Sequence, residues 1–341
     1  MKTSIAIDLG RSAAKLVAYD GANDRREMLL YPSAVIPAKP LSDEGARARA
    51  MGETVTVNTK SYYFGDTAIR QGHDDLLGGL RDDWFATDHH RALFLGGLKK
   101  LTEAGVPDVD SALIIVGLPS SMYASHKAQL AKVLSALAPQ ATIKVMPQAL
   151  GPYFALAFDE KGQETERIEA SGMYGAIEVG QYTTDYALVI EGDPIDDAYG
   201  SCSGMSKVAA SLQRILQQKD YSVTLAEATQ ALATKQIKNF GKVVDVWTEV
   251  TAAVEPLAEE IYMKSREVFG SYLRKLDKIV LAGGGAGLVA PRLSSEWGTL
   301  ELVPNERFAV AEGFLRYALA MTTIPEQRGK SGFLGQLFRI A

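Results

Sequence analysis

The sequence predicts an α/β protein of two similar domains with a cleft between them. Three short glycine-bearing segments indicate this fold, because each follows an apolar strand and they lie far apart in the chain. They are Asp8-Leu9-Gly10-Arg11-Ser12, Glu178-Val179-Gly180-Gln181-Tyr182 and Gly283-Gly284-Gly285. The first two are strand–turn–strand hairpins that bracket about half of the chain, and the third is a late glycine run.

Composition is consistent with two domains of ordinary size. The chain has 341 residues, of which 47% are hydrophobic, so each half can bury a core of its own. A net charge of -5 gives no general affinity for nucleic acid or for an anionic membrane. The single cysteine, Cys202, excludes an internal disulfide framework and fits a cytoplasmic protein.

Targeting segments and metal motifs are not expected. Residues 1–5 enter a strand at once without the apolar stretch of a signal peptide, and no run of 18 apolar residues predicts a membrane span. His89 and His90 are adjacent, while His73 and His126 stand alone, so we expect surface or helix-cap histidines and no metal ligands.

The first half of the chain alternates strands with helices. Apolar patterning predicts strands at residues 4–7, 14–19, 27–31, 54–57, 61–64, 111–118 and 142–146. Helical spacing predicts helices at residues 84–104, 126–137 and 148–158, the last of which tolerates Pro152 in its first turns. Residues 39–52 are polar with charges of both signs, and we interpret them as an exposed loop.

The strand–turn–strand theme returns after a polar segment at residues 162–171, which indicates a weak internal duplication. The patterning there predicts strands at residues 175–179, 185–191 and 278–282 and helices at 204–217, 225–234, 246–273 and 306–321. We therefore expect a first domain at residues 1–165, with a small subdomain around 31–85. A second domain follows at 166–305, with a helical subdomain around 215–275. After it come a closing helix at 306–323, which returns to the first domain, and an amphipathic tail at 324–341.

The two hairpin turns have the composition of phosphate-binding loops. Glycine lets the backbone approach a phosphate closely and turn its N–H groups inward, which Gly10 and Gly180 would do. Ser12, Thr183 and Thr184 add hydroxyl groups, and Lys15 adds a point charge for a β-phosphate. A lone Asp-x-Gly turn is more often an ordinary hairpin, but paired hairpins followed by a glycine run favour a polyphosphate site.

Two acidic residues precede these turns. Asp8 and Glu178 each stand where a strand ends, and a carboxylate there can hold Mg²⁺ or its water ligands. The run at residues 283–287 lies too late in the chain for a Rossmann fingerprint. It either lets a flat base or ribose lie against the backbone or forms only a tight strand–helix turn.

The order of these motifs resembles the actin-like ATPase superfamily. Residues 8–15 and 178–185 correspond to its two phosphate hairpins, 145–148 to its connecting segment and 282–287 to its adenosine motif. Within it, the bacterial plasmid-segregation actins of the ParM/StbA type are similar at Lys144-Val145-Met146-Pro147-Gln148, and also at residues 114–123, 198–204 and 307–314.

The resemblance implies a fold, a cofactor and a set of site residues. It implies the two-domain actin/ribonuclease-H-like ATPase fold with a central nucleotide cleft, which binds ATP or GTP with Mg²⁺. Gln148, Asp8 and Glu178 would be the catalytic residues, and Asp8 and Glu178 would hold the metal. The residues implied to bind nucleotide are Gly10, Arg11, Ser12, Lys15, Gly180, Gln181, Tyr182, Thr183, Gly204, Lys207, Gly283, Gly284, Gly285 and Ala286.

Several positions depart from the family pattern. Gln148 stands where Glu or Gln is usual, and a glutamine orients a water without accepting its proton. Glu178 replaces Asp, Tyr182 needs more room than the usual small residue, and Arg11 replaces Ser or Thr. These departures predict slow hydrolysis of ATP to ADP and phosphate.

As a function, the resemblance implies a filament-forming ATPase that stacks head to tail on itself and serves plasmid segregation or cargo positioning. A plasmid adaptor protein is a further implied partner, and no direct contact with nucleic acid is expected. Alternatives are a sugar or acetate kinase of the same superfold, a chaperone-type ATPase, and a nucleotide-binding scaffold with little turnover. The tail carries Phe333, Leu334, Leu337 and Phe338 at helical spacing, and docking on the chain itself or on a neighbour is favoured over a membrane anchor.

Overall fold

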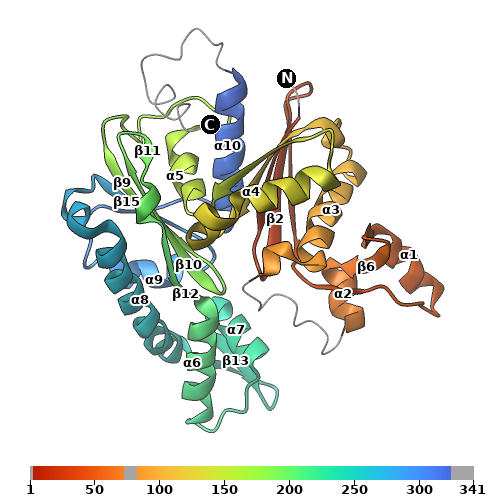
Figure 1. Cartoon of the computed structure of the whole chain (residues 1–341). Coiled ribbons are helices and arrows are strands. Elements are labelled where there is room, and N and C mark those ends of the chain that lie inside the picture. Colours follow the sequence, from red (N-terminus) through yellow and green to blue (C-terminus); the bar gives the residue numbers. More distant parts are fainter. Residues whose placement is uncertain (1–2, 73–82, 324–341) are drawn as a thin grey trace. The chain divides into compact units, whose positions relative to one another are not determined.

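The computed structural model describes residues 3–72 and 83–323, which divide into two compact units (Figure 1). Unit 1 contains the chain up to Glu169 and again from Phe308, and unit 2 contains Ala170–Arg307. The tail at 324–341 and His73 lie outside the described residues. Among the helices that are described, none has the length and apolar character that crossing a membrane requires.

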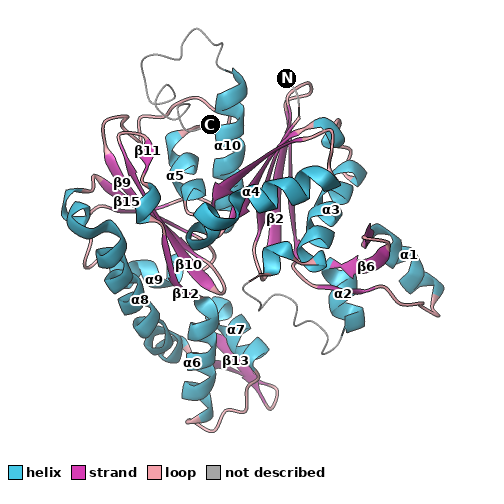
Figure 2. Ribbon diagram, viewed as in Figure 1, coloured by secondary structure: helices cyan, strands magenta, loops and turns pink. Residues whose placement is uncertain are grey.

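Unit 1 is built on a mixed five-stranded sheet in the order β3-β2-β1-β7-β8 (Figure 2). The first three strands form an antiparallel meander, and β1, β7 and β8 run parallel. Their bounds are β1 Ser4–Leu9, β2 Ala13–Asp20, β3 Arg25–Pro32, β7 Leu113–Leu118 and β8 Thr142–Pro147. All five confirm predicted strands to within two residues at each end.

One face of this sheet packs on two long helices. Ile5, Ile7 and Leu16 of the sheet share a core with Leu93 and Phe94 of α3 and with residues of α4. These helices are α3 Asp88–Glu103 and α4 Ser120–Leu137, accompanied by short 3₁₀ turns at Trp84–Ala86 and Val109–Ser111. The helix predicted at 126–137 begins earlier, directly after Pro119.

The other face is covered by α5 (Leu150–Ala157) and by α10 (Ala309–Thr323), which brings the end of the described chain back to unit 1. The two helices cross in backbone contact, since a Cβ on Gly313 would lie 1.8 Å from the carbonyl oxygen of Gly151. An ion pair between Arg26 Nη2 and Glu312 Oε2, 2.5 Å apart, fastens α10 to β3. A 3₁₀ turn at Glu306–Phe308 leads into α10.

A small subdomain extends unit 1 between β3 and α3. Its sheet has the order β4-β6-β5 and confirms the strands predicted at residues 54–57 and 61–64, which pair as a hairpin. The elements are β4 Val35–Pro37, α1 Glu44–Gly52, β5 Thr54–Val57, β6 Lys60–Phe64 and α2 Gly65–Gly72. The expectation of a loop at residues 39–52 is therefore wrong, because residues 44–52 form a helix that begins where the Asp43 side chain accepts a hydrogen bond from Ala46 N.

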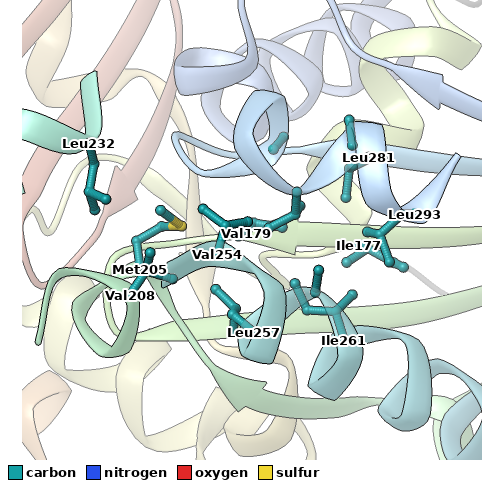
Figure 3. Packing of buried hydrophobic residues seen from close by; sticks show 14 of the residues in the cluster. Ile177, Val179, Met205, Val208, Leu232, Val254, Leu257, Ile261, Leu281 and Leu293 are labelled. Atoms are coloured by element: carbon teal, nitrogen blue, oxygen red, sulfur yellow. The ribbon is translucent and has the colours of Figure 1, made fainter. Parts of the chain in front are cut away.

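Unit 2 repeats the mixed-sheet plan, with the order β11-β10-β9-β15-β16 and β12 paired to β10. Its strands are β9 Met173–Val179, β10 Thr183–Ile190, β11 Asp193–Pro194, β12 Gly200–Ser203, β15 Lys278–Ala282 and β16 Leu300–Leu302. Ile177 and Val179 point to a core with α6, α8 and α9, as Figure 3 shows. These helices are α6 Met205–Gln217, α8 Trp247–Phe269 and α9 Ala286–Leu293, with 3₁₀ turns at Asp196–Ala198 and Gly270–Lys275.

A helical part of unit 2 carries a further small hairpin. Helix α7 (Leu225–Thr234) confirms the predicted bounds and begins with a reciprocal capping box between Thr224 and Glu227. It is followed by β13 (Gln236–Asn239) and β14 (Lys242–Asp245), two strands that the apolar pattern does not reveal. They pair only with each other among the described strands.

His90 corrects the expectation of surface or helix-cap histidines. Its side chain is only 2% exposed, edge-on to the Trp84 ring at 4.9 Å, and burial lowers the pKa of its imidazole to about 3. A folded-state pKa below the unfolded value near 6.5 means that protons bind preferentially to the unfolded chain as the pH falls from about 6.5 towards 3.

We therefore expect His90 alone to lower the free energy of unfolding by about 2 kcal/mol between pH 7 and pH 5. Urea unfolding of the natural chain and of His90→Gln at both pH values measures this. The variant is less stable at pH 7 but should lose about 2 kcal/mol less on acidification. Equal losses in the two proteins would show that His90 is not the titrating group.

Candidate functional site

The two predicted phosphate hairpins have the same geometry. In unit 1, Leu9 pairs with Ala14 across the turn, and in unit 2, Val179 pairs with Thr184. The turns therefore comprise residues 10–13 and 180–183, with the same number of residues in each. The acidic residues also correspond, because Asp8 lies opposite Lys15 and Glu178 lies opposite Asp185. The internal duplication thus extends to the register of the strands.

In unit 1 the structure brings three predicted residues together. Asp8 is 2% exposed, and its carboxylate accepts from Lys15 Nζ and from Gln148 Nε2, both at 2.7 Å. A carboxylate only accepts, so the amide nitrogen of Gln148 must face it and the amide oxygen remains available to a water. Gln148 lies between β8 and α5, ahead of the helix in which it was expected.

Gly117 on the neighbouring strand β7 makes room for this contact. A Cβ at that position would lie 2.9 Å from Gln148 Cγ and 3.2 Å from the Phe314 ring. A larger residue would therefore displace Gln148 from Asp8. The sequence places Gly117 in a strand end but offers no signal of this role.

Ser33 fixes the first turn from the side. Its backbone N–H donates to Ser12 O at 3.0 Å and its hydroxyl donates to Gly10 O. The Ser12 side chain is exposed, and Arg11 is half-buried beside it. Ser33 was not predicted, because it belongs to the connection that follows β3 and carries no motif.

In unit 2 the predicted glycine segments converge on the end of β9. Gly180 N donates to Thr183 O at 2.8 Å, which closes the turn, and Gly180 O accepts from Met205 N at 3.0 Å. Gly204 packs against the backbone of this turn, because a Cβ there would lie 2.7 Å from both Gly180 O and Thr183 N. The N-terminus of α6 is therefore tied to the second turn, with Gln181 O accepting from Ser206 N at 2.6 Å.

The late glycine run packs on the same place. Gly283 has φ +95, and a Cβ there would lie 2.4 Å from Val179 O. Gly285 donates its N–H to Val179 O at 3.1 Å and leaves space for Met205, which belongs with Val179 to the apolar cluster of Figure 3. Gly284 differs, because nothing lies within 4 Å of the position of its Cβ. The run is thus a tight strand–helix turn whose middle residue has an open side.

Glu306 holds this turn in position. Its backbone carbonyl accepts from Gly283 N, and its carboxylate Oε2 accepts from Gly287 N, each at 3.0 Å. The carboxylate therefore lies at the start of α9, which begins at Ala286, where the helix dipole favours negative charge. Sequence reasoning missed Glu306, since no motif links it to residues 283–287.

Glu178 and Asp185 place two carboxylates on the same face of the sheet. Both are buried, and Thr183 Oγ1 donates to Asp185 Oδ2 at 2.8 Å. Like charges directly opposite each other destabilise a strand pair, and carboxylate oxygens are the ligands that Mg²⁺ prefers. The residues present therefore fit a Mg²⁺ ion that is bound directly or through water. Over the described ranges, no group of three or more His, Cys, Asp or Glu side chains is arranged to hold a metal ion.

Lys207 is engaged at the start of α6. Its Nζ lies 2.7 Å from Glu260 Oε2, while Ser203 donates to Glu260 Oε1 from its N–H and its hydroxyl. Partial burial acts to raise the pKa of Glu260, but the hydrogen bonds from Lys207 and Ser203 lower it below its ordinary value. Lys207 therefore faces a carboxylate whose ionised form is favoured. Glu260 was not predicted.

The fold and these turns define an actin-like protein, and comparison with known families agrees. Residues 6–151 match the family described as the N-terminal domain of actin-like proteins. Residues 176–295 match the family described as the C-terminal domain of archaeal MreB-like actin homologues. The chain therefore resembles actin-like proteins over two consecutive parts of its length. No curated protein sequence matches it.

Solved structures share the fold over nearly the whole chain at low sequence identity. A 15-stranded ParM filament from Clostridium botulinum is 20% identical, covers 93% of this chain and 98% of its own, and has a TM-score of 0.70. The archaeal actin homologue Ta0583 in complex with ADP is 19% identical, with 94% and 100% covered and a TM-score of 0.65. The actin-like protein Alp7A is 14% identical, with 94% and 97% covered and a TM-score of 0.69.

Proposed function

We propose that this chain is a nucleotide-dependent, filament-forming ATPase of the ParM/StbA type. One observation carries the proposal: Gly180, Gly204 and the run at 283–285, which are far apart in sequence, meet at the end of β9 and leave Gly284 open. This cluster of glycines leaves room for a flat nucleoside beside a phosphate-binding turn. The first turn, in unit 1, is flanked by a charged pair, Asp8 and Lys15.

The proposed phosphate-binding residues of unit 1 are Gly10, Arg11, Ser12 and Lys15, and those of unit 2 are Gly180, Gln181, Tyr182 and Thr183. Gly283, Gly284, Gly285 and Ala286 receive the base and ribose of ATP or GTP, with Gly204 and Lys207 beside them. Asp8 and Glu178 are the residues that would hold Mg²⁺, directly or through water, and the ion would neutralise phosphate charge.

Hydrolysis depends on Gln148. Its amide nitrogen donates to Asp8, so its oxygen accepts a hydrogen bond from a water and aligns that water with the terminal phosphate. A glutamine takes no proton from the water, so turnover is slow. The amide acts only by orientation, which the buried Asp8 contact fixes.

Filament growth follows from a head-to-tail contact, because a heterologous contact that does not close continues indefinitely. The ParM structure cited above is itself a filament, which supports self-association here. We propose that nucleotide favours stacking, that hydrolysis loosens it, and that the filaments segregate a plasmid or position another cargo through an adaptor protein in the cytoplasm.

Right-angle light scattering and electron microscopy with Mg-ATP, Mg-GTP, Mg-ADP and no nucleotide test this function. Filaments that form with a nucleoside triphosphate and disappear as phosphate is released are the expected result. Nucleotide binding is measured separately by calorimetry. Binding without filaments, together with phosphate transfer to a sugar or acetate, would replace the filament with a kinase, and absence of binding would remove the nucleotide site.

A further inference from the structure

The β13–β14 hairpin is a separate two-stranded ribbon in the helical part of unit 2 (Figure 1). Its inner face is anchored, because Ile237 is buried in the core cluster of unit 2 and Val244 packs against the same cluster. The register places Lys238 opposite Val243, one position away from the Ile237–Val244 pair and so on the opposite face. Val243 is 67% exposed there. The hairpin therefore has a packed face and an exposed apolar and basic face.

The tip of the hairpin places an aromatic ring in solvent. Phe240 has φ 45 and is 100% exposed, and Gly241 follows with φ 82. Positive φ at both central residues is the two-residue turn that favours Asn-Gly, whereas a bulky side chain in this conformation is strained. Phe240 thus has an unfavourable backbone conformation and an exposed ring, and neither contributes to the packing of the fold. Strain and exposure at a single residue indicate a functional constraint.

Positive charge lies along this hairpin, at its base and on both of its strands. Between residues 235 and 247 there are three lysines, Lys235, Lys238 and Lys242, against the single acidic residue Asp245, although the whole chain has a net charge of -5. Trp247, directly after the hairpin, is 58% exposed, and Lys235 Nζ lies 5.8 Å from the centre of its ring. Lysine next to exposed aromatic and aliphatic groups is the pattern of protein surfaces that enter the interface of a membrane.

We propose that the β13–β14 hairpin docks on the surface of an anionic lipid bilayer, with the Phe240 ring inserted among the acyl chains and Lys238 and Lys242 at the headgroups. The tip is convex, since a Cβ on Gly241 would meet nothing within 4 Å. A fluid bilayer accepts such a protrusion without a matching pocket. A nucleic acid would gain from the lysines and the two aromatic rings but would not reward exposure of the aliphatic Val243. This proposal goes beyond the proposed function and needs no nucleotide.

The ring and the lysines contribute on a similar scale. Transfer of one phenylalanine side chain out of water changes a partition coefficient by about thirtyfold. Two lysines beside an anionic surface contribute about thirtyfold together. A single hairpin therefore binds weakly, and copies joined in one assembly bind much more tightly because their contacts act together.

Co-sedimentation of the full chain with vesicles tests the proposal, using phosphatidylcholine alone and phosphatidylcholine mixed with phosphatidylserine. The informative variant is Phe240→Asn, because asparagine suits positive φ and should leave the hairpin at least as stable. We expect Phe240→Asn to lower partitioning onto the mixed vesicles by about thirtyfold. The double variant Lys238→Gln, Lys242→Gln should lose a similar factor on mixed vesicles and little on neutral ones.

Phe240→Trp is the matched control, since an indole ring also enters the interface and should retain binding. The residues after 323 are the same in every variant, so the ratios report the hairpin. Equal vesicle binding by the natural chain and Phe240→Asn would overturn the proposal, as would a natural chain that does not bind mixed vesicles. Loss of filaments without vesicles in Phe240→Asn would instead make the hairpin a contact between copies. Loss of retention on single-stranded DNA would make it a nucleic-acid contact.

Discussion

Replacing Gln148 by leucine is expected to lower the rate of nucleotide hydrolysis by about a hundredfold while leaving ADP affinity nearly unchanged. Leucine has a similar size but offers no oxygen to a water and no N–H to Asp8. Lys15 still neutralises Asp8 at 2.7 Å, so the carboxylate keeps a charged partner. Single-turnover hydrolysis and calorimetric titration with ADP measure the two quantities.

Gly117→Ala provides a second route to the same result. It keeps the glutamine but introduces a Cβ 2.9 Å from Gln148 Cγ, so the amide must move away from Asp8. Hydrolysis should fall in this variant as well, by less than in Gln148→Leu. If Gln148→Leu hydrolyses nucleotide at the natural rate, another residue aligns the water and the role given to Gln148 is wrong.

Two of the late glycines, Gly283 and Gly284, are expected to respond differently to alanine. Gly283→Ala should lower the free energy of unfolding by about 3 kcal/mol, because φ +95 disfavours a side chain and Val179 O lies 2.4 Å from the new Cβ. Gly284→Ala adds its methyl group to open space and should change stability by less than about 0.5 kcal/mol. Urea denaturation distinguishes the two.

Nucleotide affinity is expected to depend on the open position, Gly284. Gly284→Val, which is also directed into the open space, should weaken binding by about tenfold or more because the side chain occupies the place given to the base. Its unfolding midpoint serves as the control for folding. Natural affinity in a folded Gly284→Val protein would show that the nucleoside does not lie against this side of the run.

Local patterns predicted the hairpins well because they depend on neighbours in sequence. The strand pairs that flank Gly10 and Gly180 follow from short apolar runs separated by turn residues. The start of α7 follows from Thr224 and Glu227, whose spacing of three residues is that of a capping box. The β13–β14 hairpin escaped notice for the converse reason. Its turn contains Phe240 where Asn would have signalled positive φ.

Helix α1 shows how composition can hide an element. Charges of both signs between Lys39 and Gly52 indicated a loop, yet alanine and arginine are strong helix formers. Ala50 is the residue that this helix buries, so no apolar periodicity was present to detect. Propensity and the Asp43 cap carried the signal that the hydrophobic pattern lacked.

The part of the site that sequence could not supply consists of contacts between distant residues. Gln148 and Asp8 were each singled out, but their hydrogen bond joins positions 140 apart in sequence and depends on β7 lying between their strands. Ser33, Gly117, Glu260 and Glu306 act by holding other residues in place. Such supporting roles follow from packing, for which a single sequence carries no motif.

The crossing of Gly151 and Gly313 has a mechanical consequence. The chain leaves unit 1 after Glu169, which follows α5, and re-enters it at Phe308, directly before α10. The two helices that cross at these glycines are therefore the ones next to the two connections between the units. With no side chain between their backbones, these helices cannot slide past each other without a clash. Within unit 1, α5 and α10 are therefore expected to move as one body, without sliding along each other.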